Sequence, residues 1–315
     1  MAAAPQLSLP LLSATREGAG KRALVTGIAG FTGRYVAEEL RAAGYEVIGL
    51  ASTAGEHGAE NVAVDLTDRA ALAAAVHSLQ PDVVVHLAAI AFVAHSDVEQ
   101  IYRVNVTGTR NLLEALATAP KKPAAVLLAS SANIYGNADA GVIGEDTPAA
   151  PANDYAVSKL AMEYMARLWM DRLPLIFVRP FNYTGVGQAE NFLLPKIVSH
   201  FKRREARIEL GNLHVWRDFS DVRVVAASYR HLLAAGPAAI GKTFNVCSGK
   251  AYSLGEALDM MGAIAGYRID VHVNPAFVRA NEVVRLTGDN TRLQGVVGAI
   301  DPPPLEQTLR WMYEA

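Results

Sequence analysis

Several features that the sequence lacks exclude whole classes of protein. Cysteine occurs once among the 315 residues, as Cys247, so no intramolecular disulfide can form, and such usage is typical of a reducing compartment, here the cytoplasm. No apolar run reaches the roughly 18 residues that a membrane-spanning helix needs. Neither sign of charge prevails, because 29 Lys and Arg face 31 Asp and Glu. This balance indicates neither nucleic acid nor an anionic membrane surface as a partner.

The first twenty residues, MAAAPQLSLPLLSATREGAG, stand apart from the rest of the chain. A secretory signal would explain their LSLPLLSA stretch, but no basic residue precedes it, and Pro5 and Pro10 interrupt it. We therefore expect residues 1–20 to form a disordered extension.

What the chain has in abundance is short apolar runs that alternate with amphipathic stretches. The runs occupy residues 22–27, 46–51, 61–66, 82–89, 125–131, 173–180 and 243–248. They are rich in Val, Ile and Leu without polar alternation, which is typical of strands buried on both faces. Their alternation with helical patterns predicts an α/β fold, a Rossmann-type doubly wound parallel sheet with right-handed crossovers.

The pattern changes after Arg179, where Gly, Pro and aromatic residues crowd irregular segments. This change predicts a second, smaller α+β domain for the substrate, built from residues 179–221 and 249–315. Residues 21–178 and 222–248 would form the dinucleotide-binding domain, because a later apolar run, TFNVCS, would return to the first sheet.

Three glycines follow the first apolar run, in TGIAGFTGRY, with the spacing GxxGxxG. They allow a sharp turn out of the strand, a close approach of backbone N–H groups to a pyrophosphate, and tight packing of the next helix. An ordinary strand-to-helix turn can show this spacing, but its place at the first strand of a βαβ unit favours dinucleotide binding. The predicted cofactor-binding residues of this loop are Gly27, Gly30, Phe31, Thr32, Gly33 and Arg34.

The end of the second run bears on the choice of dinucleotide. An NAD site usually has a carboxylate there for the ribose, whereas this chain has Ala51, Ser52 and Thr53. Arg34 is a candidate to meet a 2′-phosphate, and the alternative is a solvated helix residue. The sequence therefore favours NADP(H), with NAD(H) as the alternative and Ser52 as a ribose contact.

Two further places are predicted to contact the cofactor. Asp65, with Leu66 beside it, is a candidate acceptor for the adenine amino group, and it is also a candidate helix N-cap. The motif HLAA ends the fourth run where the cofactor would cross the sheet edge, which adds Leu87, Ala88 and Ala89. No metal site is predicted.

The segment YAVSK places a phenol and an ammonium four residues apart. Because positions i and i+4 share one helix face, Tyr155 and Lys159 point to the same spot. A phenol has an ordinary pKa of about 10, and a nearby positive charge favours the phenolate, so we expect Lys159 to lower the pKa of Tyr155. The pair alone is common on helices, but with a glycine loop and a hydroxyl-ended strand it indicates a proton-transfer site.

In order and spacing, the motifs GxxGxxG, HLAA, SSANIYG, YAVSK and RPFN resemble the extended short-chain dehydrogenases/reductases, over about residues 22–315. That family acts largely on nucleotide sugars. The resemblance implies that Ser131 holds the substrate oxygen, that Tyr155 exchanges the proton, and that Lys159 is its partner. It further implies that Asn105 helps to place Lys159 through water and that Ser130 is a supporting substrate contact.

The residues after Ser131 distinguish branches of that family. Its sugar 4,6-dehydratases carry a Glu two positions after the hydroxyl residue, in one branch with an Asp between, and need that acid to remove the C5 proton. This chain has Ala132 and Asn133 there, so the resemblance implies reduction or oxidation without elimination. Asn133 becomes a candidate substrate contact.

The second domain supplies the remaining candidates by resemblance. Arg217 in ELGNLHVWRDFSDV would clamp a sugar nucleotide's pyrophosphate, unless it forms a structural ion pair with Asp218. Arg279 would be a second clamp with Glu282 as its partner or as a ribose contact, although Ala280 replaces the family's usual proline. Asn182 in RPFNYTGVGQ is a further substrate contact.

Together the resemblance implies NAD(P)H-dependent reduction of the C4 ketone of a nucleotide-linked 4-keto-6-deoxyhexose, with a GDP-linked sugar favoured. A nucleotide-sugar 4-epimerase with tightly bound NAD is the main alternative, and a regulatory binding module on the same fold is a second. Helices predicted at 98–119 and 154–171 match those that pair as a four-helix bundle in family dimers, so we expect a homodimer.

Overall fold

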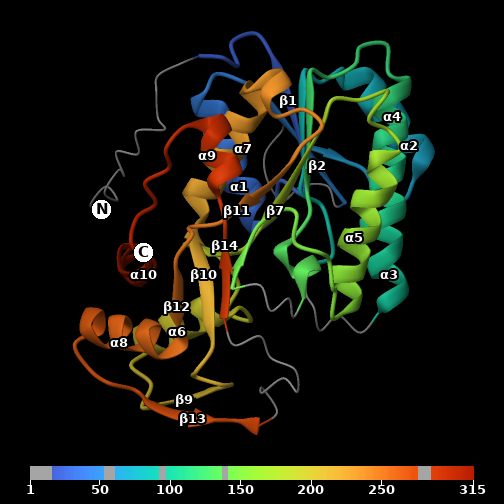
Figure 1. The fold of residues 1–315 in the computed structure, drawn as a ribbon. Coiled ribbons are helices and arrows are strands. Elements are labelled where there is room, and N and C mark those ends of the chain that lie inside the picture. Colours follow the sequence, from blue (N-terminus) through green and yellow to red (C-terminus); the bar gives the residue numbers. More distant parts are fainter. Residues whose placement is uncertain (1–15, 53–60, 92–96, 137–140, 276–284) are drawn as a thin grey trace.

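The computed structural model describes residues 16–52, 61–91, 97–136, 141–275 and 285–315, and within them it confirms the predicted α/β fold. Figure 1 shows a parallel sheet with helices on both faces, and a smaller region of strands and helices at one end. The seven strands lie in the order β11-β7-β5-β4-β1-β2-β3, and each neighbouring pair is parallel. They span Arg22–Thr26 (β1), Glu46–Ala51 (β2), Asn61–Ala63 (β3), Val83–His86 (β4), Ala125–Ala129 (β5), Leu175–Pro180 (β7) and Thr243–Val246 (β11).

Helices cover the large sheet in two layers because the central strands are apolar on both faces. Val83 and Val85 of β4 face one layer, whereas Val84 between them faces the other. The first layer holds α1 (Phe31–Ala42), α7 (Val222–Ala234) and α9 (Thr291–Val297), and the second holds α2 (Arg69–Leu79), α4 (Thr109–Thr118) and α5 (Asp154–Arg167). The alternation of strand side chains therefore builds two separate cores from one sheet.

The predicted helix over residues 98–119 consists of three consecutive parts. It begins as α3 (Val98–Tyr102), continues as one π-helical segment, η1 (Arg103–Gly108), and ends as α4. A π-helical turn shifts the backbone hydrogen bonds by one residue and is often found at functional sites. Here that turn contains the candidate residue Asn105.

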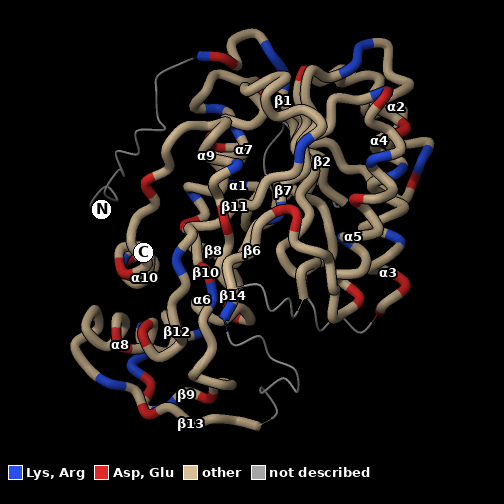
Figure 2. Tube along the Cα trace, viewed as in Figure 1, with Lys and Arg blue, Asp and Glu red and all other residues tan. Residues whose placement is uncertain are grey.

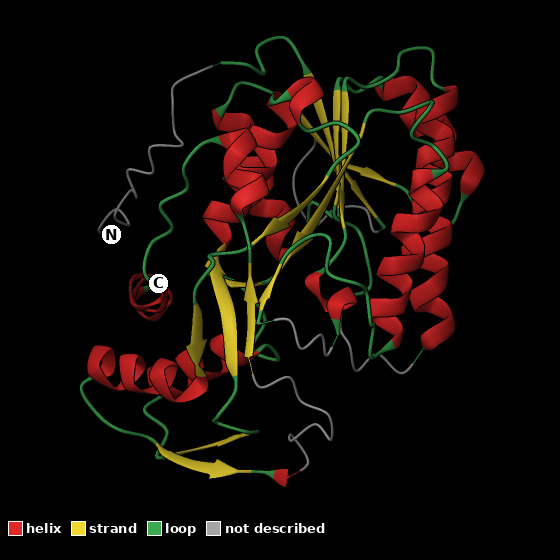
Figure 3. Cartoon of the chain, in the orientation of Figure 1, coloured by secondary structure: helices red, strands yellow, loops and turns green. Residues whose placement is uncertain are grey.

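The smaller region is built around a mixed sheet in the order β12-β10-β14-β6, with β8 paired to β10, and a separate pair β13-β9. Figure 3 shows how these strands extend away from the large sheet beside their helices. Its strands span Val142–Ile143 (β6), Asn182–Thr184 (β8), Arg207–Leu210 (β9), Trp216–Asp221 (β10), Ala251–Ser253 (β12), Asp270–Val273 (β13) and Arg285–Gly288 (β14). Helices α6 (Leu193–Lys202), α8 (Leu254–Ala265) and α10 (Leu305–Glu314) enclose its core. Short 3-10 turns lie at Ala132–Tyr135 (η2) and Gly236–Ala238 (η3).

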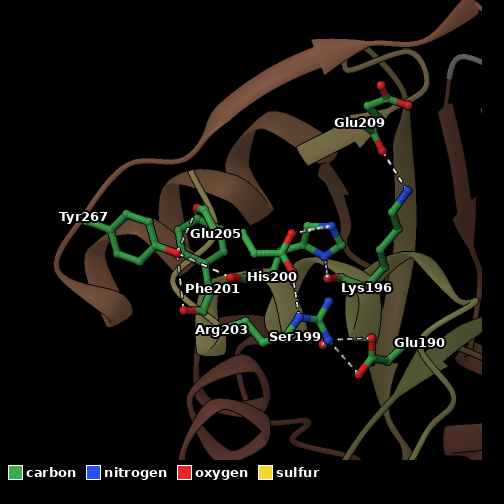
Figure 4. Close-up of polar contacts among 9 residues, drawn as sticks. All are labelled: Glu190, Lys196, Ser199, His200, Phe201, Arg203, Glu205, Glu209 and Tyr267. Atoms are coloured by element: carbon green, nitrogen blue, oxygen red, sulfur yellow. Dashed lines mark hydrogen bonds and ion pairs between the residues drawn. The ribbon is translucent and has the colours of Figure 1, made fainter. Parts of the chain in front are cut away.

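Polar contacts attach α6 to its surroundings at the outer end of this region. Arg203 bridges Glu190 and Glu205, and the Lys196 ammonium donates to the Glu209 carbonyl of β9 at 2.8 Å (Figure 4). His200 faces the carboxylate of Glu205 at 3.3 Å. These charges are largely exposed and satisfied by one another, and Figure 2 shows both signs of charge distributed over the two regions.

The predicted domain ranges stay a prediction, and three segments pack across them. Strand β6, from within residues 21–178, joins the smaller sheet beside β14. Helix α9, from within residues 249–315, packs in the core of the large sheet through Leu293. Residues 16–20 of the predicted extension form a turn in which Glu17 pairs with Arg230 of α7. No helix in the described parts of the chain is both long and apolar enough to cross a membrane.

Candidate active site

The glycine loop turns directly out of β1 at the edge where the strand order reverses. Gly27 has a φ of +70°, and a Cβ there would lie 2.9 Å from the Ala88 nitrogen. A Cβ on Gly33 would lie 2.2 Å from the Gly27 carbonyl oxygen, so α1 can pack this closely only with glycine. The junction between β4 and β1 is the switch point where α/β sheets bind nucleotides, and the start of α1 faces it. The loop thus forms a cradle that fits a dinucleotide.

The structure also brings the predicted adenosine contacts to this edge. Ser52 is exposed at the end of β2, and the Asp65 carboxylate accepts a hydrogen bond from the Thr67 nitrogen at 2.8 Å. The N-cap of α2 is Asp68, whose carboxylate accepts from two backbone N–H groups, so the helix-cap interpretation of Asp65 is wrong. Leu66 is buried against the second core, and its backbone carbonyl accepts from Asn111.

Arg34 lies at the start of α1 and has a hydrogen-bond partner in the smaller region. Its guanidinium donates to the Gly187 carbonyl at 3.0 Å, which joins the cofactor helix to the smaller region. Two neighbouring residues of α1 also bond to the smaller region. Thr32 shares a 2.7 Å hydrogen bond with Tyr183, and Tyr35 donates to the Val186 carbonyl at 2.7 Å. Sequence reasoning missed this junction, for which the aromatic and glycine residues of FNYTGVG are the only signal.

Tyr155 and Lys159 lie on the buried face of α5, against the end of β5. Their exposed fractions are 8% and 5%, and the Lys159 ammonium donates to the Ala129 carbonyl at 2.8 Å. Burial raises the pKa of Tyr155 to about 12, while the Ser131 hydroxyl lowers it. Burial lowers the pKa of Lys159 to about 8, against the influence of Glu163. The pKa of Tyr155 is therefore raised overall and not lowered as expected, because desolvation of the phenolate outweighs the lowering influences.

Ser130 and Ser131 follow β5 directly and are both buried. The Ser131 hydroxyl accepts a hydrogen bond from the Asn133 nitrogen at 3.1 Å and so begins the turn η2. The Ser130 hydroxyl has no hydrogen-bond partner among the described residues. A buried hydroxyl without a partner is costly, so this oxygen is well suited to contact a bound molecule. Asn133 is exposed and available on the same turn.

Asn105 is connected to α5, the helix that carries Tyr155 and Lys159, through the side chain of Ser158. Its side-chain amide donates to the Ser158 hydroxyl at 3.0 Å, and that hydroxyl donates to the Tyr155 carbonyl at 2.7 Å. Its side-chain oxygen accepts from the Ile90 nitrogen at 2.8 Å. The Asn105 side chain is thus connected through Ser158 to the helix turn that carries Tyr155, and its predicted role of placing Lys159 through water stays a prediction.

A buried ion pair supports the same helix one turn further on. The Arg179 guanidinium donates to both oxygens of the Glu163 carboxylate, at 2.9 and 2.7 Å, and also to the Tyr135 hydroxyl. The neighbouring carboxylate of Glu145 accepts from the Asn245 nitrogen and faces Arg292. These acids are engaged by basic groups, so neither replaces the acid that a dehydratase carries after its strand-end hydroxyl. Sequence reasoning missed this pair.

The predicted substrate contacts of the smaller region, Arg217 and Asn182, are less buried than the residues around Tyr155. Asp218 is buried, and its carboxylate accepts from Ser248, Gly249 and Gly288. Successive side chains of a strand point to opposite faces, so Arg217 and Asp218 of β10 point away from each other. The Arg217 guanidinium donates to the Trp216 carbonyl at 2.9 Å.

The remaining predicted substrate contacts are Asn182, Arg279 and Glu282. Asn182 is exposed and donates weakly to the Asp218 carbonyl at 3.4 Å. Arg279 and Glu282 lie outside the described residues. Within the described ranges, no three His, Cys, Asp or Glu side chains are grouped to hold a metal ion.

Known proteins share this arrangement. Residues 23–247 match the NAD dependent epimerase/dehydratase family. The chain is 34% identical to GDP-6-deoxy-D-talose 4-dehydrogenase from Aggregatibacter actinomycetemcomitans, over 87% of this chain and 90% of that protein. It is 33% identical to GDP-6-deoxy-D-mannose reductase from Pseudomonas aeruginosa, over 92% of this chain and 95% of that protein.

Two solved structures are also similar. A protein from Burkholderia cenocepacia J2315, named as a candidate epimerase, is 54% identical with a TM-score of 0.89 and covers 94% of this chain and 98% of its own. RMD from Pseudomonas aeruginosa, solved with NADPH, is 29% identical with a TM-score of 0.81 and covers 93% of this chain and 98% of its own. The chain is thus an enzyme of the NAD dependent epimerase/dehydratase family, the extended short-chain dehydrogenases/reductases.

Proposed function

We propose that this enzyme uses NADPH to reduce the C4 ketone of a GDP-linked 4-keto-6-deoxyhexose, as a GDP-4-dehydro-6-deoxy-D-mannose reductase does. The observation that carries the proposal is the buried group of Ser131, Tyr155 and Lys159 with Ala132 and Asn133 beside it. This group contains what a carbonyl reduction needs and omits the acid that an elimination needs. The curated relatives named above act on GDP-linked 6-deoxyhexoses, which supports the choice of sugar.

Ser131, Tyr155 and Lys159 each have a defined part in this reaction. A bound nicotinamide supplies the hydride that C4 receives. Ser131 donates a hydrogen bond to the C4 oxygen as its negative charge develops. Tyr155, which its raised pKa keeps protonated at neutral pH, gives the proton to that oxygen. The Lys159 ammonium holds the nicotinamide ribose and stabilises the phenolate that remains.

The cofactor is proposed to lie along the edge from Ser52 and Asp65, across Gly27 and Ala88, to Tyr155. NADP(H) is favoured because the end of β2 carries no carboxylate in its described residues and because RMD was solved with NADPH. Arg34 keeps guanidinium donors beyond the one that bonds Gly187, so it can also meet a 2′-phosphate. NAD(H) is the alternative.

The sugar nucleotide is proposed to lie against the smaller region. Ser130, Asn133 and Asn182 would contact the hexose, and Arg217 would bind the diphosphate, for which a planar guanidinium is well suited. The same contacts serve GDP-D-rhamnose or GDP-6-deoxy-D-talose as product, since the configuration at C4 depends on which ring face meets the nicotinamide.

A homodimer belongs to the same proposal. Helices α3 and α5 expose Val98, Val157 and Tyr164, and Leu168 follows α5 directly, with Tyr164 67% and Leu168 81% accessible. Large exposed apolar side chains gathered on neighbouring helices mark interaction surfaces, and a four-helix bundle between two copies would cover them. Light scattering after size exclusion should report about twice the chain's 33.6 kDa.

The enzyme assay follows absorbance at 340 nm. Purified protein is mixed with NADPH, or with NADH, and with GDP-4-keto-6-deoxymannose generated from GDP-mannose by a separate dehydratase. We expect a rapid loss of absorbance, faster with NADPH, and NMR couplings of the product will assign its C4 configuration. No loss with either cofactor would refute the proposed substrate.

A 4-epimerase is the second candidate, and the 54% identical structure named as a candidate epimerase favours it. An epimerase returns its hydride to the sugar and retains NAD through purification. The amount of cofactor released when the purified protein is denatured therefore distinguishes an epimerase from a reductase. Stoichiometric NAD in the denatured protein, together with interconversion of a UDP- or dTDP-hexose at C4, would replace the reductase proposal.

A further inference from the structure

A row of buried polar side chains crosses the sheet edge behind the candidate active site. Thr26 ends β1, His86 lies opposite it at the end of β4, and Thr109 begins α4. Their exposed fractions are 0%, 3% and 1%. The His86 ring lies between the two hydroxyls, with its Nδ1 2.7 Å from Thr26 and its Nε2 2.8 Å from Thr109. None of these three side chains has a task in the proposed reaction.

The two ends of the row assign every proton in it. At one end the Ala88 backbone nitrogen can only donate, and it donates to the Thr26 hydroxyl at 3.1 Å. At the other end the Asn105 backbone carbonyl can only accept, and it accepts from the Thr109 hydroxyl at 2.7 Å. Thr26 therefore donates to Nδ1 of His86, and Nε2–H of His86 donates to Thr109. Only the neutral Nε2–H tautomer of His86 gives every donor in the row an acceptor, from the Ala88 nitrogen to the Asn105 carbonyl.

Each end of the row is attached to a different part of the active site. The Ala88 nitrogen is the atom that a Cβ on Gly27 would approach at 2.9 Å, so this end supports the turn of the glycine loop. The other end is Asn105, whose side chain continues through Ser158 to the Tyr155 carbonyl. The row thus connects the cofactor loop with the helix turn that carries the proton donor.

We propose that His86, as the neutral Nε2–H tautomer, is a positioning residue that fixes the catalytic helix relative to the cofactor loop through Thr26 and Thr109. It touches neither cofactor nor substrate. Its influence on hydride and proton transfer rests on the proposed function, whereas its tautomer and its effect on Tyr155 do not.

Neutrality is essential to this role. A protonated ring would donate from both nitrogens, and the Thr26 hydroxyl would then face two donors with no acceptor for its own proton. Burial lowers the pKa of His86 to about 3, and the nearby ammonium of Lys159 lowers it further. The ring consequently stays neutral throughout the range in which the enzyme is expected to work.

The first test is a spectroscopic one on the intact protein. In ¹⁵N-histidine NMR, with the His86 signal assigned by its absence from His86→Gln, we expect a protonated Nε2 and an unprotonated Nδ1 from pH 5 to 8. An Nδ1–H tautomer, or titration of this ring within that range, would overturn the proposal.

The second test breaks the row without removing the ring. Thr109→Val keeps the shape but leaves Nε2–H of His86 unpaired and removes the side-chain hydrogen bond to the Asn105 carbonyl, whereas Thr109→Ser keeps the hydroxyl. We expect Thr109→Val to lower kcat about 10- to 100-fold with little change in KM, because misplaced reacting groups slow the chemical step. Thr109→Ser should restore kcat, and the exposed control His77→Gln should match the unmodified enzyme.

The outcomes separate this inference from the proposed reaction. A Thr109→Val enzyme that loses thermal stability but keeps its kcat would show a merely structural row and overturn the inference. If the unmodified enzyme reduces no keto sugar, the proposed function fails, and ¹³C-tyrosine NMR decides instead. The Tyr155 signal should then move in Thr109→Val and return in Thr109→Ser, and an unmoved signal would count against the inference.

Discussion

The end of the parallel sheet and the smaller mixed sheet hold their polar side chains in different ways. At the parallel sheet, Tyr155, Lys159 and Asn105 are buried, and described partners hold Lys159 and Asn105 at fixed distances. At the smaller sheet, Arg217 is half-buried and Asn182 is exposed. The comparison supports our proposal that reaction chemistry belongs to the rigid half and that recognition of a sugar nucleotide belongs to side chains on the more open half.

The largest effect should come from the rigid half. We expect Tyr155→Phe to lower kcat about 1,000-fold, because it removes the proton donor but keeps the ring. The dissociation constant of NADPH, measured by fluorescence titration, should change little because the cofactor cradle is untouched. Retention of kcat in this variant would place the proton donor elsewhere and would contradict the assignment of the reaction chemistry to the parallel sheet.

The packing of the rigid half can be tested through the buried Glu163–Arg179 pair, which joins α5 to β7. Glu163→Gln should lower the free energy of unfolding by about 3 kcal/mol, because the Arg179 guanidinium would stay buried without its counter-charge. Urea denaturation measures this. The matched control is Glu46→Gln at the exposed Arg22–Glu46 pair, which should cost less than about 1 kcal/mol. Equal losses would show that burial does not distinguish the two pairs.

The open half should respond in binding rather than in chemistry. We expect Arg217→Gln to raise the KM for the GDP-sugar about 10-fold, since one charge-assisted contact to the diphosphate is lost, while kcat stays near its original value. Arg310→Gln, on the exposed face of α10, is the control and should change neither constant. A fall in kcat with KM unchanged would assign Arg217 to the reacting centre.

The smallest effect concerns pH and stability. The pKa of His86 is lowered in the folded protein to about 3, against an ordinary value near 6.5, so the unfolded chain binds a proton that the folded one does not. Stability from this group is therefore complete above pH 6.5 and decreases as the pH falls. Between pH 6.5 and 5.5 the unmodified protein should lose about 1 kcal/mol more than His86→Gln. Parallel urea-midpoint profiles for the two proteins would contradict this.

The sequence predicted the parallel sheet well because its signal is local. Apolar runs such as EVIGLA and AVLLASS coincide with β2 and β5, and the glycine spacing placed the loop before α1. Tyr155 and Lys159 share a buried face because helical periodicity alone requires it. The family resemblance, drawn from five short motifs, was confirmed by the match over residues 23–247.

Other features depend on contacts between distant segments, and no local pattern reports them. The Thr32–Tyr183 contact joins residues 151 positions apart, and the Tyr135–Asn245 contact joins residues 110 apart. The return of α9 to the first core, through Leu293, is of the same kind.

Local patterns along the chain establish which chemical groups are present, which strands are buried, and which side chains share a helix face. The environment of those groups depends on how the whole chain packs. Burial raises the pKa of Tyr155 where the local pattern predicted a lower one, and it joins His86 to Thr26 and Thr109 in one directed row. The physical reason is that desolvation and hydrogen-bond direction are properties of the packed surroundings, which segments from the whole chain supply together.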